Sequence, residues 1–412
     1  MSDKNKTSYP KEKINVLFLE NISDVAVKYF NAAGYSSVKK ITGALSEDQL
    51  IKEIKNVHLL GIRSKTHITA RVLAAADKLQ AIGCFCIGVN QVDLKAATNK
   101  GVAVFNAPYS NTRSVAELVI GTSILLIRKI IDKNNAAHKG IWLKEAKGCF
   151  ELRGKTLGIV GYGNIGSQVS VLAESLGMKV LFFDTETKLP LGNATSTKSL
   201  KELVAMADIV SLHVPELPST KNLVNKALLK FFKPGSILIN YARGEVVDID
   251  ALAKSLADGQ LGGAAIDVFP VEPEKNGDIF TCPLQGLSNV ILTPHIGGST
   301  EEAQQNIGDD VSNKLFNYLE KGGSYGSHTI PDLSLPPQEG THRILHIHNN
   351  VPGVLSEINT TLSKHKINIL GQYLKTNESI GYVVLDLDKS LSKNAAELLK
   401  KVKDTIKVRM LY

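Results

Sequence analysis

The sequence contains few cysteines, few aromatic residues and no long apolar run. Its 412 residues include four cysteines and one tryptophan, and aromatic side chains make up 6% of the chain. No apolar run reaches the roughly 20 residues that a membrane-spanning helix requires. The polar opening segment, MSDKNKTSYPKEK, is not followed by an apolar stretch of the kind found in secretory signals. We therefore expect a globular protein that is neither inserted in a membrane nor exported.

The four cysteines show no metal-binding pattern. Cys84 and Cys86 alternate onto one face of a predicted strand, whereas Cys149 and Cys282 are far away in the sequence. A zinc site would need further ligands at matching spacing. The pattern favours reduced thiols in a reducing compartment, so we expect a cytoplasmic protein without a bound metal.

The net charge of +8 does not by itself indicate a partner. Lysine and arginine are scattered along the chain, and no motif for binding nucleic acid is present. An excess of positive charge fits an enzyme that attracts anionic substrates, but a charged surface without such a purpose fits equally well.

Short apolar segments alternate with amphipathic helical segments over most of the chain. This alternation predicts an α/β fold with two doubly wound, Rossmann-like domains, each built on a parallel sheet. Strands are predicted at 14–20, 58–64, 79–90 and 101–108, then, after a long helix at 113–130, at 157–160, 179–184, 208–215, 236–242, 262–269 and 289–295.

The pattern changes after a predicted helix at 301–320. Residues 322–340 are rich in glycine, serine and proline and have no sustained period, which is typical of a linker. Residues 341–412 show the order β-α-β-β-α-β, which predicts a small ferredoxin-like α+β domain.

The segment GYGNIG at 161–166 matches the dinucleotide-binding pattern G-x-G-x-x-G. An apolar strand precedes it, a helical pattern follows, and a second strand then ends at Asp184. Gly161 permits a tight turn, Gly163 a close approach of the pyrophosphate, and Gly166 close packing of helix on strand. Asp184 can bind the ribose hydroxyls and repel a 2′-phosphate, so the sequence predicts NAD rather than NADP. An incidental glycine-rich turn beside an unrelated carboxylate is the alternative.

Three polar residues follow predicted strands: Arg243 in NYARGEVVD, Glu272 in DVFPVEP and His295 in TPHIGGST. Ligands of open α/β sheets gather at the carboxyl ends of strands, so these residues can face one cleft. Oxidation of a 2-hydroxy acid needs a base such as histidine, a carboxylate to orient that base, and a cation such as arginine for the substrate carboxylate. Taken singly, each of the three is more often a surface or capping residue.

These three contexts, with GYGNIG and Asp184, resemble the D-isomer-specific 2-hydroxyacid dehydrogenase family. The likeness extends over nearly all of residues 14–320 and includes LHVP at 212–215. The roles that the resemblance implies are acid/base catalysis for His295, orientation of that base for Glu272, substrate anchoring for Arg243 and a contact to the nicotinamide carboxamide for Asp267.

The resemblance also implies further contacts to the cofactor. Tyr241 stands where the family usually has a small residue, and it predicts a modest change in the cofactor pocket. The implied cofactor-binding residues are Gly161, Gly163, Asn164, Ile165, Gly166, Asp184, His213, Tyr241, Ala242, Arg243, Asp267, His295 and Gly298.

Other segments, among them GIRSKTHIT and FNAPYSNTRSVAE, resemble the phosphoglycerate dehydrogenase branch of this family. Arg63 and Ser64 lie at the end of a predicted strand, where they can bind an anion, and Asn111 opens the long helix. Capping of that helix by Asn111 or Thr112 is an equal alternative. Lys144 can reach a phosphate in a neighbouring subunit, while the nearby Trp142 fits an interface anchor equally well.

The C-terminal segments HIHNNVPGVLSEI and INILGQY resemble an ACT domain, an amino-acid-sensing module. By this resemblance His348, Asn350 and Asn368 bind L-serine at an interface between two such domains, and asparagine side chains can pair with both charged groups of a free amino acid. Val351 stands where the family often has an arginine. The three histidines of HRILHIH share one strand face, and a metal site there is the alternative.

The resemblance therefore implies oxidation of D-3-phosphoglycerate to 3-phosphohydroxypyruvate with NAD, at the first step of L-serine biosynthesis and under feedback inhibition by L-serine. It also allows side activity on 2-oxoglutarate, and it implies a homotetramer without nucleic-acid or membrane partners. The alternatives are another D-2-hydroxyacid dehydrogenase, such as a hydroxypyruvate reductase, or a non-catalytic NAD-sensing protein. The predicted domains are a substrate-binding domain (1–107, completed by 301–330), an NAD-binding domain (108–300), a linker (331–340) and an ACT domain (341–412).

Overall fold

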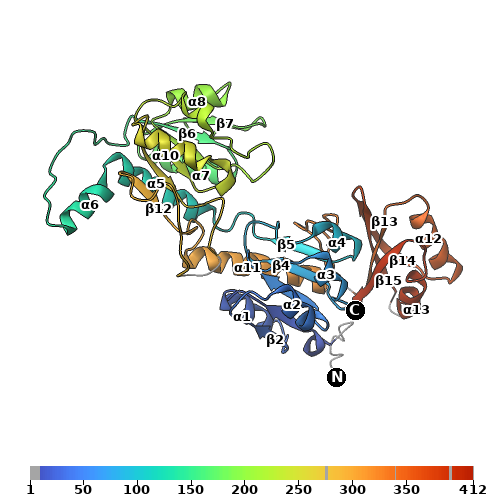
Figure 1. Ribbon diagram of the computed structural model, residues 1–412. Helices are drawn as coiled ribbons and strands as arrows, with labels where there is room; N and C mark the ends of the chain where they lie inside the picture. Colours follow the sequence, from blue (N-terminus) through green and yellow to red (C-terminus); the bar gives the residue numbers. More distant parts are fainter. Residues whose placement is uncertain (1–9, 274–276, 339, 389–391, 412) are drawn as a thin grey trace. The chain divides into compact units, whose positions relative to one another are not determined.

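The computed structural model describes residues 10–273, 277–338, 340–388 and 392–411. The chain divides into two compact units, one formed by residues 1–110 with 305–412 and the other by residues 111–304 (Figure 1). The chain passes from one unit to the other after residues 110 and 304, which lie three and four residues beyond the predicted boundaries. The second of these positions falls inside the continuous helix α11 (Glu301–Lys321). Within the described ranges, no helix is both long and apolar enough to cross a membrane.

The first unit begins with a five-stranded parallel sheet of order β2-β1-β3-β4-β5. All residues of β3 and β4 are buried because helices cover both faces of the sheet. The strands are shorter than predicted, and β1 ends before Glu20 and Asn21, whose φ angles are 58° and 51°. The elements are β1 (Val16–Phe18), α1 (Asp24–Ala32), β2 (Val38–Lys40), α2 (Glu47–Ile54), β3 (Leu59–Ile62), α3 (Ala70–Ala74), β4 (Ala81–Cys84), α4 (Leu94–Asn99) and β5 (Ala103–Asn106), after a 3-10 turn at Lys11–Lys13.

The second unit is built on a seven-stranded parallel sheet of order β12-β11-β10-β9-β6-β7-β8. The predicted helix 113–130 is two helices, because Lys129 adopts a left-handed conformation (φ 52°) that interrupts it. The elements are α5 (Thr112–Ile127), α6 (Ile130–His138), β6 (Thr156–Val160), α7 (Asn164–Ser175), β7 (Lys179–Phe183), β8 (Thr195–Ser196), α8 (Leu200–Met206), β9 (Ile209–Leu212), α9 (Lys226–Leu229), β10 (Ser236–Asn240), a 3-10 turn at Gly244–Val246, α10 (Ile249–Ala257), β11 (Leu261–Ile266) and β12 (Val290–Leu292).

Two sets of strand ends lie level in this sheet. Val160, the last residue of β6, pairs with Phe183 in β7 and Leu212 in β9. Ile266 of β11 pairs with Asn240 in β10 and Leu292 in β12. The order of connection reverses at β6, where doubly wound sheets form a crevice for ligands.

The C-terminal residues form a four-stranded antiparallel sheet of order β14-β15-β13-β16 with two helices on one face (Figure 1). The predicted fold class, two parallel α/β domains and a small α+β domain, is thereby confirmed. The elements are β13 (His342–Asn349), α12 (Val354–Lys364), β14 (Ile369–Thr376), β15 (Ile380–Leu387), α13 (Ser392–Leu399) and β16 (Thr405–Leu411).

Strand β15 is buried along its whole length because both faces of this sheet are covered. Val383 and Leu385 pack in a core with α12 and α13. Tyr382 and Val384 point to the opposite face and pack in a second core with Phe105 of β5 and with residues of α11. The C-terminal domain thus shares a hydrophobic core with the rest of the first unit.

Candidate active site

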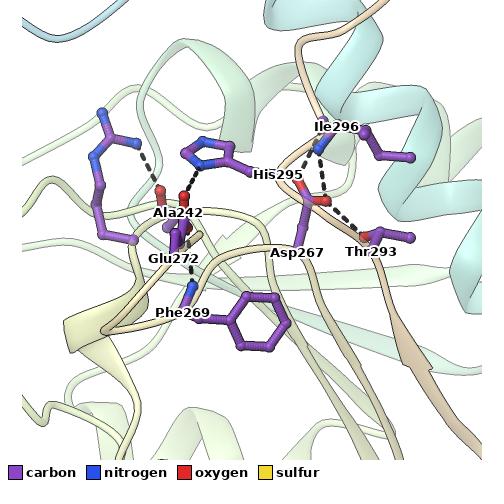
Figure 2. Close-up of polar contacts among 9 residues, drawn as sticks. Ala242, Asp267, Phe269, Glu272, Thr293, His295 and Ile296 are labelled. Atoms are coloured by element: carbon purple, nitrogen blue, oxygen red, sulfur yellow. Dashed lines mark hydrogen bonds and ion pairs between the residues drawn. The ribbon is translucent and has the colours of Figure 1, made fainter. Parts of the chain in front are cut away.

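A histidine–glutamate pair lies beyond the carboxyl ends of β11 and β12. Nδ1 of His295 and Oε2 of Glu272 are 2.9 Å apart (Figure 2). Oε1 of Glu272 accepts a hydrogen bond from the backbone N–H of Phe269 at 3.1 Å. The His295 side chain is 54% exposed. Because the pair uses Nδ1, the other ring nitrogen, Nε2, is the atom that can take a proton from a substrate.

The loop that carries His295 is held by Asp267, which is only 1% exposed. One oxygen, Oδ1, accepts hydrogen bonds from the Thr293 hydroxyl (2.6 Å) and the Ile296 amide (2.8 Å) (Figure 2). The other oxygen, Oδ2, accepts one from the Gly297 amide (2.7 Å). These bonds over-determine the loop, in which His295 has a φ of 56°. Sequence reasoning missed this positioning role because two of the three donors are backbone amides, which no residue pattern reveals.

Arg243 lies near the pair, and its positive charge lowers the pKa of both Glu272 and His295. Its Nη1 donates to the carbonyl of Ala242 at 2.6 Å, and its own carbonyl accepts from Asn240 at 2.9 Å. The next residue, Gly244, approaches the backbone of Phe269 so closely that a Cβ would lie 2.1 Å from it. The structure therefore brings together the three residues predicted for catalysis.

The pair has opposite pKa shifts. The hydrogen bond that His295 donates to Glu272 raises the pKa of His295 above its usual value, although burial opposes this effect. Burial raises the pKa of Glu272, but the hydrogen bond and charge of His295, the Phe269 amide and Arg243 outweigh burial and leave that pKa below its usual value. An anionic Glu272 therefore stabilises a protonated His295.

Replacing Glu272 with glutamine should move the pH profile to lower pH. Oxidation needs neutral His295, so its rate rises as pH increases through the pKa of that residue. Without the carboxylate this pKa falls, and the acid limb for oxidation and the alkaline limb for reduction both shift downward. Measurement of kcat/KM against pH in both directions tests this, and limbs that stay in place would contradict the role of Glu272.

The cofactor loop follows β6, whose last residue pairs with the last residues of β7 and β9. The backbone N–H of Gly161 donates to Phe183 at 2.9 Å, and that of His213 donates to Val160 at 2.7 Å. A Cβ on Gly166 would lie 2.2 Å from the Gly161 carbonyl, whereas a Cβ on Gly163 would meet open space. Gly166 therefore allows the close packing predicted for it, and Gly163 leaves room at the N-terminus of α7.

Asp184 follows β7 and turns toward this loop. Oδ2 accepts from the Tyr162 amide at 2.8 Å, and Oδ1 accepts from the Glu186 amide at 3.0 Å. His213 has a buried Nδ1 without a partner among the described residues, and burial lowers its pKa to about 3. A neutral imidazole nitrogen and a half-buried carboxylate suit the amide and ribose groups of a dinucleotide, so the residues present fit NAD.

The other residues assigned to the cofactor occupy different environments. Asn164 and Ile165 begin α7. A Cβ on Gly298 would lie 2.3 Å from Nδ2 of Asn111, so the TPHIGGST loop and the start of α5 are close. Tyr241 is 6% exposed and packs in the core between the sheet and α5, and Ala242 is also buried. The larger side chain of Tyr241 therefore fills core space.

Cofactor preference provides a test of Asp184. The double change Asp184→Ser with Thr185→Arg should lower kcat/KM for NAD about 10- to 100-fold, because a charged hydrogen-bond acceptor is lost. It should raise kcat/KM for NADP, whose 2′-phosphate no longer meets a carboxylate. Steady-state kinetics with both cofactors give the ratio, and a melting curve checks the turn that Asp184 caps. An unchanged ratio in a folded variant would exclude this role.

The residues predicted for the substrate lie in both units. Arg63 and the exposed Ser64 follow β3 in the first unit. Asn111 occupies the N-cap position of α5, but its side chain makes no capping hydrogen bond. The buried Oδ1 of Asn111 and Oγ1 of Thr112 have no partner in the part of the chain that the structure describes. These groups are therefore available to a ligand, and the capping alternative is wrong for Asn111. Lys144 lies exposed after α6, near Trp142, which is 85% exposed.

The residues predicted for an effector begin at the end of β13. His348 is 4% exposed, and its Nδ1 bonds the Asn349 carbonyl at 2.8 Å. Its buried Nε2 is unpartnered among the described residues. Asn350 donates to the Asn377 carbonyl at 2.8 Å, and Asn368 is exposed just before β14.

Comparison with known proteins defines the class to which this geometry belongs. Residues 120–297 match the family model described as D-isomer specific 2-hydroxyacid dehydrogenase, NAD binding domain, and residues 344–407 match an AHAS small subunit-like ACT domain. The chain belongs to the D-isomer-specific 2-hydroxyacid dehydrogenase family. The predictions of this family, of NAD as cofactor and of an ACT domain are confirmed.

Within that family the chain is similar over its full length to D-3-phosphoglycerate dehydrogenases. It is 54% identical over 408 residues to the enzyme of Haemophilus influenzae, covering 99% of this chain and 100% of the other. It is 52% identical over 409 residues to the Escherichia coli K12 enzyme, with the same coverage. The crystal structure of D-lactate dehydrogenase from Aquifex aeolicus, complexed with NAD and lactic acid, matches with a TM-score of 0.67 and 27% identity over 77% of this chain and 100% of that one.

Proposed function

We propose that this protein oxidises D-3-phosphoglycerate to 3-phosphohydroxypyruvate with NAD, at the entry to L-serine biosynthesis, and that L-serine inhibits it through the ACT domain. The observation that carries the proposal is the His295–Glu272 pair, 2.9 Å apart, in a chain that matches D-3-phosphoglycerate dehydrogenases from end to end. A non-catalytic NAD-sensing protein would not need this paired base.

In the proposed reaction, neutral His295 takes the proton of the C2 hydroxyl at Nε2, and Glu272 stabilises the imidazolium that results. Arg243 binds the substrate carboxylate through its planar guanidinium. Bound NAD supplies the hydride acceptor. Arg63, Ser64 and Asn111 hold the rest of the anionic substrate, and Lys144 of a neighbouring subunit adds positive charge.

Several finer points belong to the same proposal. His348, Asn350 and Asn368 bind L-serine at a contact between two ACT domains. The exposed apolar segment around Trp142 pairs two NAD-binding domains, so that these contacts and the ACT contacts together form a homotetramer. The four free cysteines fit a cytoplasmic location.

The test is NADH-linked turnover on 3-phosphoglycerate/3-phosphohydroxypyruvate, hydroxypyruvate, pyruvate/lactate and 2-oxoglutarate, each with and without millimolar L-serine. We expect the phosphorylated pair to have the highest kcat/KM and L-serine to suppress it, with 2-oxoglutarate as a slower side substrate. Dominance of an unphosphorylated acid would overturn the substrate assignment, and full activity in serine would overturn the assigned regulation.

A further inference from the structure

A buried carboxylate organises the turn that carries Arg63 and Ser64. Glu20 follows β1 and is 8% exposed. Its Oε1 accepts hydrogen bonds from the backbone amides of Arg63 (3.1 Å) and Thr66 (2.8 Å), and its Oε2 accepts one from the amide of Lys65 (2.9 Å). Three amides of one short turn thus depend on a single side chain from a distant part of the sequence.

A second buried side chain holds the same turn from the other side. Nε2 of Gln91, which is 3% exposed, donates to the Arg63 carbonyl at 2.7 Å. The carbonyl of Gln91 in turn accepts from the Ile68 amide at 2.8 Å. The peptide groups on both sides of Arg63 are therefore fixed, and the turn cannot rotate without breaking hydrogen bonds to buried polar groups.

The backbone at Glu20, the residue that carries this carboxylate, adopts an unfavourable conformation. Glu20 and Asn21 have φ angles of 58° and 51°, in the left-handed region that non-glycine residues adopt less readily. Their amides donate to the carbonyls of Gly43 (3.1 Å) and Ile41 (3.3 Å), which hold the strained turn in place. Such strain persists where the surrounding structure over-determines it, and it clusters at functional sites.

The charge of Glu20 leaves Arg63 free to act. The carboxylate faces backbone N–H donors, and the ion pairs found among the described residues do not include the Arg63 guanidinium. Glu20 therefore orients the turn without neutralising the cation that the turn presents. A glutamine at this position would direct its amide N–H₂ at a backbone N–H donor, so at least one hydrogen bond would be lost.

We propose that Glu20, supported by Gln91, is a positioning residue that sets Arg63 and Ser64 to bind the phosphate of the substrate and so determines the preference for a phosphorylated hydroxy acid. This inference rests on the proposed function, in which Arg63 and Ser64 contact the phosphate. A role confined to fold stability would change the melting temperature but would not separate phosphorylated from unphosphorylated substrates.

The test compares 3-phosphohydroxypyruvate with hydroxypyruvate, which differ only in the phosphate. In Glu20→Gln we expect KM for 3-phosphohydroxypyruvate to rise about tenfold or more, the ratio that corresponds to one lost interaction of ordinary strength. We expect its kcat to change less than about threefold and the constants for hydroxypyruvate to stay near those of the wild type. Glu20→Asp, which keeps both oxygens, should restore part of the loss.

Four further variants sharpen the result. Glu53→Gln removes an exposed carboxylate of the same unit that pairs with Lys39, and it should change neither substrate. Arg63→Ala should lose the preference for phosphate directly. In the Arg63→Ala background, Glu20→Gln should add little, because a residue that acts through Arg63 has a non-additive effect. If Glu20→Gln does not fold, Gln91→Leu tests the other side of the turn and should show the same split.

Each outcome separates this inference from the proposed function. An unchanged ratio of the two KM values in Glu20→Gln and Gln91→Leu, or full additivity with Arg63→Ala, overturns the positioning role while the proposed function stands. A wild-type protein that prefers unphosphorylated acids overturns the proposed function and this inference with it.

Discussion

Replacing His295 with asparagine is expected to reduce turnover about 10²- to 10⁴-fold, the usual contribution of a positioned general base. The loss follows from geometry, because His295 is the residue whose ring bonds Glu272 at 2.9 Å and presents its other nitrogen at an exposed position. Asparagine is the appropriate replacement because it tolerates the left-handed conformation that His295 adopts, with a φ of 56°. The Asp267 hydrogen bonds to the loop should therefore survive.

The measurement pairs steady-state turnover with NADH binding followed by fluorescence. We expect the dissociation constant for NADH to remain within about threefold of the wild-type value, because the glycine loop and Asp184 are unchanged. The matched control is His365→Asn, which alters an exposed histidine at the end of α12 and should leave turnover intact. Near-normal turnover in His295→Asn would remove this residue from the mechanism.

Replacing Asp386 with alanine is expected to destabilise the C-terminal domain by about 3–5 kcal/mol, the usual cost of leaving a buried charge unpaired. The charge is that of Arg343, whose side chain is 0% exposed. Its Nε and Nη2 donate to the two oxygens of Asp386 at 2.7 and 2.8 Å. The remaining donors bond the carbonyls of Lys321 (3.0 Å) and Pro336 (3.3 Å), so this guanidinium joins β13 to α11 and to the segment between them.

Urea titration followed by circular dichroism measures this loss, and limited proteolysis shows whether the C-terminal domain opens first. Two variants serve as controls. Glu397→Ala removes an exposed partner of Lys400 and should move the midpoint little. Arg343→Met with Asp386→Leu removes both charges and should recover much of the stability. A wild-type midpoint in Asp386→Ala would show that Arg343 finds other compensation.

Local patterns were sufficient to predict the fold class and to select the candidate catalytic residues. The alternation of apolar residues reports the faces of strands and helices directly, since side chains repeat at fixed periods. The glycines at 161–166 and the carboxylate of Asp184 were recognisable because a dinucleotide-binding turn requires these residue types at this spacing. Arg243, Glu272 and His295 were recognisable because the ends of parallel strands lie along one edge of a sheet.

Other predictions failed or stayed incomplete because they depend on distant contacts. The break between α5 and α6 results from the left-handed conformation of Lys129, for which the apolar pattern contains no signal. The packing of the Tyr241 side chain in the core beside α5 also depends on distant contacts, and its predicted effect on the cofactor pocket stays a prediction. For Asn111 the sequence left capping and ligand binding as equal alternatives, and only the structure shows that its side chain makes no capping hydrogen bond and that its Oδ1 has no partner among the described residues.

The order of the elements, the family and the class of reaction follow from residue type and spacing along short segments, so they can be predicted without a structure. The groups that hold Arg63 and His295 in place come from distant parts of the chain, and the fold was needed to find them. Glu20 reaches the turn at Arg63, and Asp267 fixes the loop of His295, through bonds to backbone N–H groups, which every residue type except proline carries. Long-range packing likewise covers both faces of β15, so that the C-terminal domain shares its core with the first unit.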